Sequence, residues 1–295
     1  MSKSQFAESA AGSIAAEIGR IAWKALMEEV YTTPKPGLVD FYSNGAHKDM
    51  DIRTFERSAD ALREYFTYMA EQGYSLLCTP QELFSAIRKT GMTAEKAMYK
   101  ATDGVNTHKG LIFTVGIFCA AAGRCLREKA KRLSLRDLIQ TEREMVTEIL
   151  TKEISCINTN NPGSHGEVNL KNYGTLGIRG EAISGYATVV KYAIPTIRSG
   201  LKEQKEWNSI KLQTLFVLMS KVEDSNVLSR HDPGILLEVQ KEAADFLKKG
   251  GAYAEGAVEK LYAMDQTYIS RNISSGGCAD LLATAIFLIF LLERW

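Results

Sequence analysis

The stretch "LIFTVGIFCAAAG", residues 111–123, is the most informative part of the sequence about the fold. It contains no charged residue, and Gly116, Ala120 and Gly123 recur at spacings of three and four, which place small side chains on one face of a helix. A second apolar run, "LLATAIFLIFLL", occupies residues 281–292. Both runs are shorter than the about 20 residues that cross a bilayer. They predict two buried core helices and no membrane span.

Helical periodicity dominates outside these two runs, and the alternation typical of β-strands is almost absent. Start signals support the pattern: "TPQE" at 79–82 offers Thr79 as N-cap, Pro80 at the first helical position and Glu82 for a capping box, and "SLRD" at 134–137 is a weaker version. The sequence predicts an all-α protein with helices at about 5–30, 53–75, 80–90, 93–102, 108–130, 134–154, 178–199, 206–221, 233–249, 253–270 and 277–294.

Composition narrows the class of protein. No repeat or Gly/Ser linker divides the 295 residues, so we expect a single multi-helix catalytic domain over 1–295, with its cleft built from inter-helix loops. With 36 basic and 35 acidic residues the net charge is +1, which argues against nucleic acid or an anionic membrane as partner. The five cysteines lack C-x-x-C spacing, and the N-terminus lacks an apolar signal region. A cytoplasmic location is the expectation.

The loop "YTTPKPGLVDFYSNGAHKDMD", residues 31–51, is too long for a simple connector between packed helices, which usually has 2 to 8 residues. Its apolar residues argue against a solvated, disordered segment. We therefore expect an ordered loop that forms one wall of a cleft, against the loops at 102–110 and 158–181. Asp49 and Asp51 could serve as ligands of Mg²⁺, although a solvated loop with an N-cap aspartate explains them as well.

The loop "ATDGVNTHKG", residues 101–110, precedes the first apolar helix. Thr107 is a possible N-cap, and backbone N–H groups beside His108, Lys109 and Gly110 could hold a phosphate. A capped core helix with an outward-pointing Lys109 is an equal alternative.

Three further loops interrupt the helices with polar groups. They are "NTNNPGSHGEVNLKNYGTLGIRGE" at 158–181, "VEDSNVLSRHD" at 222–232, and the start of "RNISSGGCADLLATAIF" at 271–287. Taken singly, each could be a surface loop or a helix cap. Together, five such loops could meet at one end of a helical bundle and form an active site.

The amino-acid sequences of these loops resemble those of one enzyme family. "TTPKPGLVD…NGAHKDMD", "ATDGVNTHKG", "HGE", "GIRGEA", "DSNVLSR" and "RNISSGGCADLL" occur in this order from about Glu29 to Leu282 and resemble the triphosphoribosyl-dephospho-CoA synthases of citrate lyase and malonate decarboxylase. The sequence departs from the family pattern at His231-Asp232, where two glycines are common, and at "SSGGC", where Ser-Pro-Gly-Gly-Ser is common.

The resemblance implies a glycosyl transfer. The 5-triphosphoribosyl group of ATP moves to the 2′-hydroxyl of 3′-dephospho-CoA, and adenine is released; the product is the prosthetic-group precursor for an acyl carrier protein, to which a second transferase attaches it. Such a reaction builds positive charge on the ribose, so it needs nearby carboxylates, a hydrogen-bond donor or acid for adenine and a base for the hydroxyl. Mg²⁺ is the expected cofactor for the triphosphate.

Within that chemistry, the expected roles fall into three groups. His47 and His108 are candidate proton carriers because a histidine pKa is near neutrality. Asp49, Glu167 and Asp224 are candidates for metal binding or for stabilising the ribosyl cation, with Asp49 and Glu167 also catalytic candidates. The expected phosphate-binding residues are Lys35, Lys48, Thr107, Lys109, Gly110, Arg179, Arg230, Ser274, Gly276 and Gly277.

Two other functions stay open on the sequence. A metal-dependent phosphohydrolase of His-Asp type could use His47, His231, Asp232 and Asp280, although a His-Asp dipeptide is a weak signal. A helical module that binds a nucleotide without turnover is the other alternative.

Overall fold

The computed structural model describes residues 3–129, 132–157, 163 and 165–295, and these residues form helices, turns and loops without a β-strand. The all-α prediction is confirmed. In chain order the elements are α1 (Lys3–Val30), α2 (Ile52–Ser75), α3 (Pro80–Ala101), α4 (Lys109–Lys129), α5 (Leu135–Ser155), α6 (His165–Tyr173), α7 (Gly177–Ile183), the π-helix η1 (Val189–Ala193), α8 (Ile194–Lys202), α9 (Trp207–Met219), α10 (Ser225–Arg230), α11 (Pro233–Lys248), the 3₁₀-helix η2 (Gly251–Tyr253), α12 (Ala257–Ser270) and α13 (Gly276–Arg294).

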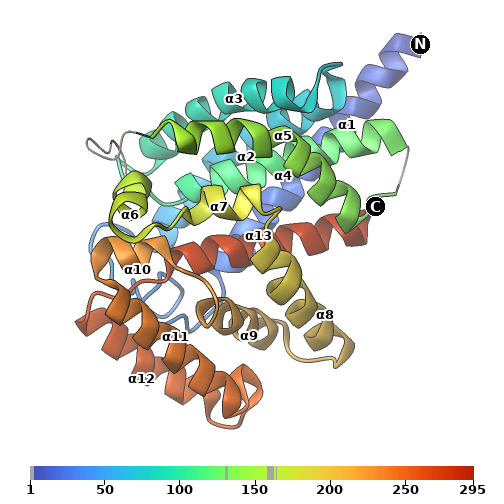
Figure 1. Cartoon of the computed structure of the whole chain (residues 1–295). Helices are drawn as coiled ribbons and strands as arrows, with labels where there is room; N and C mark the ends of the chain where they lie inside the picture. The colour runs from blue at the N-terminus through green and yellow to red at the C-terminus, as the bar shows by residue number, and fades with distance from the viewer. Residues whose placement is uncertain (1–2, 130–131, 158–162, 164) are drawn as a thin grey trace.

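Helix α13 runs through the middle of the molecule, with α1–α5 on one side and α8–α12 on the other (Figure 1). By length and composition α4 and α13 could each cross a membrane, but 78% and 67% of their most apolar stretches are buried by the rest of the protein. This burial is what core helices show, as the apolar runs predicted. One hydrophobic cluster extends from Ala15 on α1 to Leu291 on α13, so the two sides share a core.

The helix boundaries agree with the sequence patterns at most ends. Thr79 accepts a hydrogen bond from the Glu82 N–H in a capping box, and Ser134 caps α5 through the Asp137 N–H, as predicted. The predicted break between 90 and 93 is wrong, because α3 continues through Gly91. A single glycine costs a helix interior only about 1 kcal/mol, which the buried side chains of α3 outweigh.

The predicted helix 178–199 is instead divided into α7, η1 and α8. Gly185 and Tyr186 have positive φ angles of 72° and 52° and end the first segment, and Pro195 lies in the first turn of α8. The predicted loops 158–181 and 222–232 contain two short helices, α6 and α10. The amide of Asn169 joins them by donating to the Ser225 carbonyl and the Ser229 hydroxyl, a tertiary contact that local sequence does not reveal. Residues 158–162 and 164 lie outside the described residues.

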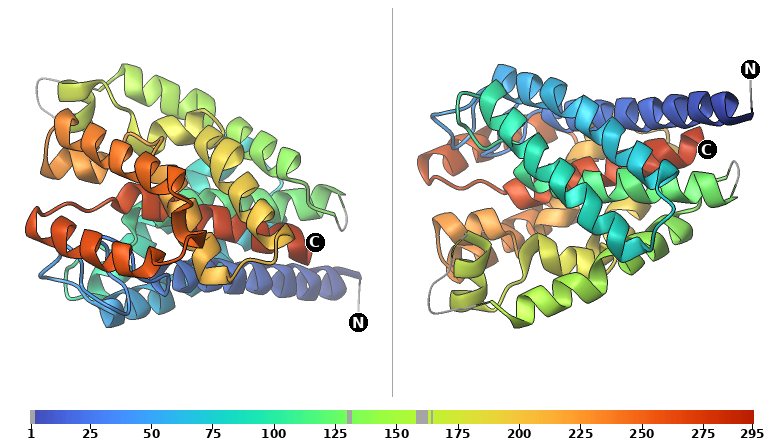
Figure 2. Two further views of the ribbon diagram at one scale, coloured as in Figure 1. Left: turned by 90° about the horizontal axis from the view of Figure 1, so that it is seen from below. Right: turned by 90° about the horizontal axis from the view of Figure 1, so that it is seen from above.

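The chain termini and the polar loops lie at opposite ends of the molecule. Both termini lie at one end, and the loop 31–51, α6 and α10 lie at the opposite end (Figure 2). The polar loops therefore gather at the end far from the termini.

Glu142 is a buried acid in the core. Its side chain on α5 is fully buried, and neither carboxylate oxygen has a hydrogen-bond partner among the described residues. Burial raises the pKa of Glu142 to about 9, and the neighbouring Arg143 only partly opposes this shift. Glu142 is therefore protonated at neutral pH, whereas an unfolded chain would ionise it.

Glu142→Gln should stabilise the protein. The folded-state pKa lies above the usual 4.5, so the glutamate lowers stability progressively as pH rises from about 4.5 to about 9. The variant should gain roughly 3 kcal/mol at pH 7 and less than about 1 kcal/mol at pH 5, as an upper bound. Urea unfolding at both pH values measures this, with the exposed Glu148→Gln on the same helix as control. An equal gain at both pH values would contradict a buried, protonated Glu142.

Candidate functional site

The loop 31–51 is ordered by two aspartates. Asp40 accepts hydrogen bonds from the backbone N–H groups of Lys35 (2.6 Å), Tyr42 (2.7 Å) and Ser43 (2.9 Å). Asp265 on α12 accepts from the Gly37 N–H and the Ser43 hydroxyl, both at 2.8 Å. These bonds close the loop on itself and attach it to α12.

Gly37 allows this loop to lie directly on the segment that precedes α13. Its φ is +71°, and a Cβ atom there would be 2.1 Å from the carbonyl oxygen of Ile273. No other residue fits without moving one of the two segments.

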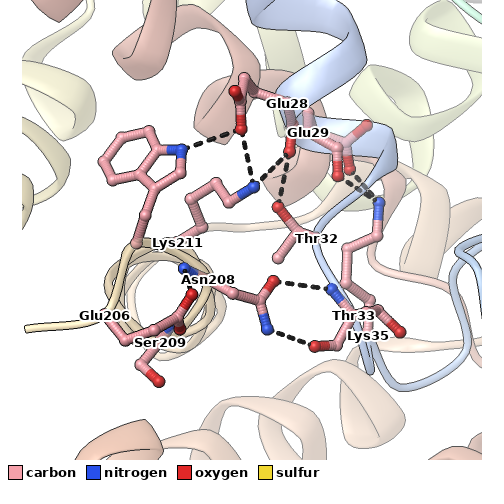
Figure 3. Close-up of polar contacts among 10 residues, drawn as sticks. Glu28, Glu29, Thr32, Thr33, Lys35, Glu206, Asn208, Ser209 and Lys211 are labelled. Atoms are coloured by element: carbon pink, nitrogen blue, oxygen red, sulfur yellow. Dashed lines mark hydrogen bonds and ion pairs between the residues drawn. The ribbon is translucent and has the colours of Figure 1, made fainter.

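Two buried lysines neutralise the C-terminal end of α1 (Figure 3). Lys35 Nζ donates to the Glu29 carbonyl at 2.8 Å and to the Glu29 carboxylate at 2.5 Å. Lys211 Nζ from α9 donates to the carbonyl and carboxylate of Glu28, at 3.0 and 2.9 Å. Cations at this end complement the helix dipole and the two acids.

Asn208, also on α9, holds the start of the loop. Its side chain accepts from the Thr33 N–H at 3.0 Å and donates to the Thr33 carbonyl at 2.5 Å (Figure 3).

A cavity of about 720 Å³ opens beside this anchored loop. Its walls include residues of the loop 31–51, residues 106–110, 174–178, 180–181 and 221–226, and the start of α13. The expectation that the opening loop forms one wall of a cleft against the loops at 102–110 and 158–181 is confirmed. The volume is in the range of small-molecule sites.

One wall of the cavity is suited to anions. Gly276 and Gly277, in the first turn of α13, line it together with Ser274 and Arg230. The Arg230 guanidinium donates to the Ala46 carbonyl and the Asn272 side chain, both at 2.9 Å, which joins the loop 31–51 to the turn before α13. Backbone N–H groups at a helix start and a nearby guanidinium form a favourable phosphate site.

Neither cavity histidine titrates near neutrality, so that part of the prediction is wrong. Burial, followed by the charge of Arg230, lowers the pKa of His47 to about 4. Burial and the charge of Lys35 lower the pKa of His108 to about 3. Both imidazoles are uncharged at pH 7, and His47 Nε2 lies 3.1 Å from the Ser274 hydroxyl.

Carboxylates form another part of the wall. Asp280 lines the cavity, and its carboxylate accepts no hydrogen bond from the described residues. Burial, then the charges of Glu29 and Asp224, raise the pKa of Asp280 well above its usual value. A Cβ at Gly110 would be 2.0 Å from Asp280 Oδ2, so glycine lets this carboxylate reach the start of α4.

Asp224 lines the cavity as predicted, but both of its oxygens are already used. Oδ1 accepts from the N–H groups of Asn226 and Val227 and caps α10, and Oδ2 accepts from the Cys278 N–H at 2.8 Å. In the structure, the Asp224 carboxylate joins the start of α10 to the start of α13.

Several predicted residues lie elsewhere. Lys48 and Asp49 are exposed, Glu167 on α6 accepts from the Gly163 N–H, and Arg179 is on α7; none of the four lines this cavity. Asp49 nevertheless lies near the cavity wall, because its charge opposes the lowering of the pKa of His47 by burial and Arg230.

The predicted phosphate-binding residues near α4 have other partners in the structure. Lys109 is at the cavity edge, with its ammonium 2.6 Å from Glu95 and its side chain 54% exposed. The predicted N-cap role of Thr107 is wrong, because α4 begins at Lys109 and the Thr107 hydroxyl donates to Ser58.

The His-Asp pair of the phosphohydrolase alternative has structural tasks. His231 Nε2 is 2.9 Å from the Asn272 carbonyl, and Asp232 caps α11. Neither lines the cavity, and no group of three His, Cys, Asp or Glu side chains among the described residues is placed to hold a metal. The geometry does not assemble that site.

Sequence reasoning did not assign Glu29, Ser58 or Ser275. Two glutamates at the C-terminal end of a predicted helix oppose the helix dipole, and this was a usable signal that cations lie there. Ser58 and Ser275 are fully buried hydroxyls that carry no local signal of their environment.

Comparisons with known proteins show the family of this chain. A family model described as CitG, ATP:dephospho-CoA triphosphoribosyl transferase, matches residues 15–295. A probable 2-(5″-triphosphoribosyl)-3′-dephosphocoenzyme-A synthase of Vibrio cholerae is 39% identical over 92% of this chain and 87% of its own length. The synthase of Escherichia fergusonii is 38% identical over 92% and 89%. No solved structure matches. The chain belongs to the ATP:dephospho-CoA triphosphoribosyl transferase family.

Proposed function

We propose that this chain transfers the 5-triphosphoribosyl group of ATP to the 2′-hydroxyl of 3′-dephospho-CoA and releases adenine. Family membership over nearly the whole chain supports the reaction class. The product would be the prosthetic-group precursor for an acyl carrier protein, and the cytoplasm, the location expected from the sequence, suits both substrates.

The observation that carries the proposal is the position of Asp280 between two helix starts. The first turns of α4 and α13 line the cavity with Arg230, and the Asp280 carboxylate lies against Gly110 in the same space. Helix N-termini and a guanidinium stabilise phosphates. A carboxylate stabilises the positive charge that develops on C1″ when the bond to adenine breaks.

The chain also offers ligands that fit Mg²⁺. Magnesium in nucleotide sites uses one or two carboxylates, with water and substrate phosphates completing its coordination. Glu29 and Asp280 both line the cavity. Burial, then the charge of Glu29, raise the pKa of Asp280, and a divalent cation would relieve this cost of ionising Asp280. These two residues would hold the ion, which would neutralise phosphate charge during the transfer.

The products test the function directly. Incubation of the purified chain with ATP, Mg²⁺ and dephospho-CoA should give free adenine in step with a dephospho-CoA adduct that retains three phosphates, as measured by mass spectrometry. Omission of dephospho-CoA should suppress adenine release. ADP or AMP with adenine attached would replace this proposal with a phosphohydrolase, and thermal stabilisation by ATP without any product would favour a binding module.

Asp280→Asn should lower turnover and raise stability. Asparagine cannot ionise beside the ribosyl cation, so kcat should fall by about 10²- to 10³-fold. Because the folded-state pKa of Asp280 is raised, the acid costs stability as pH rises above its usual pKa, so the amide should increase Tm at pH 7. Glu293→Gln, exposed on the same helix, is the control. Full activity in Asp280→Asn would remove this residue from the mechanism.

Arg230→Gln should weaken ATP binding more than Lys109→Ala. Arg230 is partly buried on the anion-binding wall, and loss of a charge-assisted contact should cost about 1.5–3 kcal/mol, or roughly tenfold or more in Kd. Lys109 is half-exposed and paired with Glu95, so its loss should have the smaller effect. Calorimetry measures both, with Arg271→Gln as a control on the adjacent turn. The reverse order would place the phosphates at the start of α4.

A further inference from the structure

His108 has one ring nitrogen without a partner. The residue is 1% exposed and lines the cavity, and its Nε2 atom has no hydrogen-bond partner among the described residues. An unpaired buried nitrogen is costly, so native proteins rarely leave one unless a water, an ion or a ligand completes it. Here the adjoining space is the substrate cavity.

The other ring nitrogen is held by a chain of hydroxyls. The Thr107 hydroxyl donates to Ser58 Oγ at 2.7 Å, and Ser58 Oγ lies 2.7 Å from His108 Nδ1. Since Ser58 accepts from Thr107, its own single proton is free to point at Nδ1. In a neutral imidazole this leaves the proton on Nε2, so the nitrogen without a partner is an N–H donor.

The surroundings of His108 favour an uncharged, aromatic acceptor. Burial and Lys35 hold the pKa of His108 at about 3, so the ring stays neutral. Phe55 meets the imidazole edge-on, with ring centroids 5.0 Å apart, and Phe55, Leu38 and Met50 line the same cavity. Phosphates are better served by the cationic wall at Arg230, whereas a heterocyclic base fits an apolar wall with one neutral donor.

We propose that His108 Nε2–H donates a hydrogen bond to a ring nitrogen of the adenine of ATP, and that Ser58 is a positioning residue that holds this tautomer. The inference rests on the proposed function. When C1″–N9 breaks, the bonding electron pair passes to adenine while the 2′-oxygen forms the new bond to C1″. The hydroxyl proton is released, adenine takes up one proton from solvent, and His108 keeps its own. The hydrogen bond from His108 therefore becomes stronger as negative charge develops on the adenine.

Nitrogen NMR of ¹⁵N-histidine-labelled protein tests the tautomer. The chain has four histidines, and His108→Gln assigns the signal. At pH 7 we expect a neutral ring protonated on Nε2, and a loss of that preference in Ser58→Ala. A ring protonated on Nδ1, or an imidazolium, would overturn the proposal.

Kinetics with 1-deaza-ATP, 3-deaza-ATP and 7-deaza-ATP test the contact, because N1, N3 and N7 are the ring nitrogens of adenine that can accept a hydrogen bond. Ser58→Ala should lower kcat with ATP by about five- to tenfold, with a smaller change in KM. With the one analogue that lacks the accepting nitrogen, the variant and the wild type should differ by less than about twofold, because the bond is absent from both. His108→Gln, which retains a donor, should lose less than His108→Phe. Ser85→Ala, an exposed serine on α3, is the control.

An equal loss in Ser58→Ala with ATP and with all three analogues would overturn the adenine contact. A wild-type chain that releases no adenine would overturn the proposed function instead. In that case the NMR experiment still decides the state of His108, so the two failures are distinguishable.

Discussion

The ion pair between Lys35 and Glu29 is the interaction on which the functional end of the molecule depends. Both side chains are buried, and the lysine also donates to the Glu29 carbonyl in the last turn of α1. Removing one partner of a buried pair leaves an uncompensated charge, at a cost of about 3–5 kcal/mol. The pair therefore determines how the chain leaves α1, and the loop 31–51 takes its course from that point.

The same pair sets the electrostatics of the cavity. Burial, then the charge of Glu29, raise the pKa of Asp280, and burial, then the charge of Lys35, lower the pKa of His108. The protein thus makes Asp280 costly to ionise and His108 costly to protonate, beside an anion-binding wall. Groups held at such a cost are typical of binding and catalytic sites, where a ligand supplies the missing charge or partner. Glu142, by contrast, is a costly buried acid outside the cavity wall.

Most of the fold was predictable from local patterns. The apolar runs of α4 and α13 and the capping box of α3 each depend on residues within a few positions of one another. Predictions from local sequence patterns were wrong where tertiary contacts determine the backbone conformation. Because its side chains are buried, α3 continues through Gly91. Positive φ angles at Gly185 and Tyr186 divide the segment after α7. The side chain of Asn169 joins two short polar helices, α6 and α10.

The sequence by itself determined the all-α class, the core helices and the set of loops that meet at the cavity, because these follow from periodicity and from short ordered motifs. Which side chains line the cavity depends on the tertiary structure: Asp49, Glu167 and Arg179 do not line it, whereas Glu29 and Asp280 do. The tertiary structure also determines the protonation states, because the pKa values of His47 and His108 depend on burial and on charges distant in sequence. A residue type specifies which chemistry is available, but desolvation and neighbouring charge, which only the folded chain sets, determine the form in which that chemistry is present.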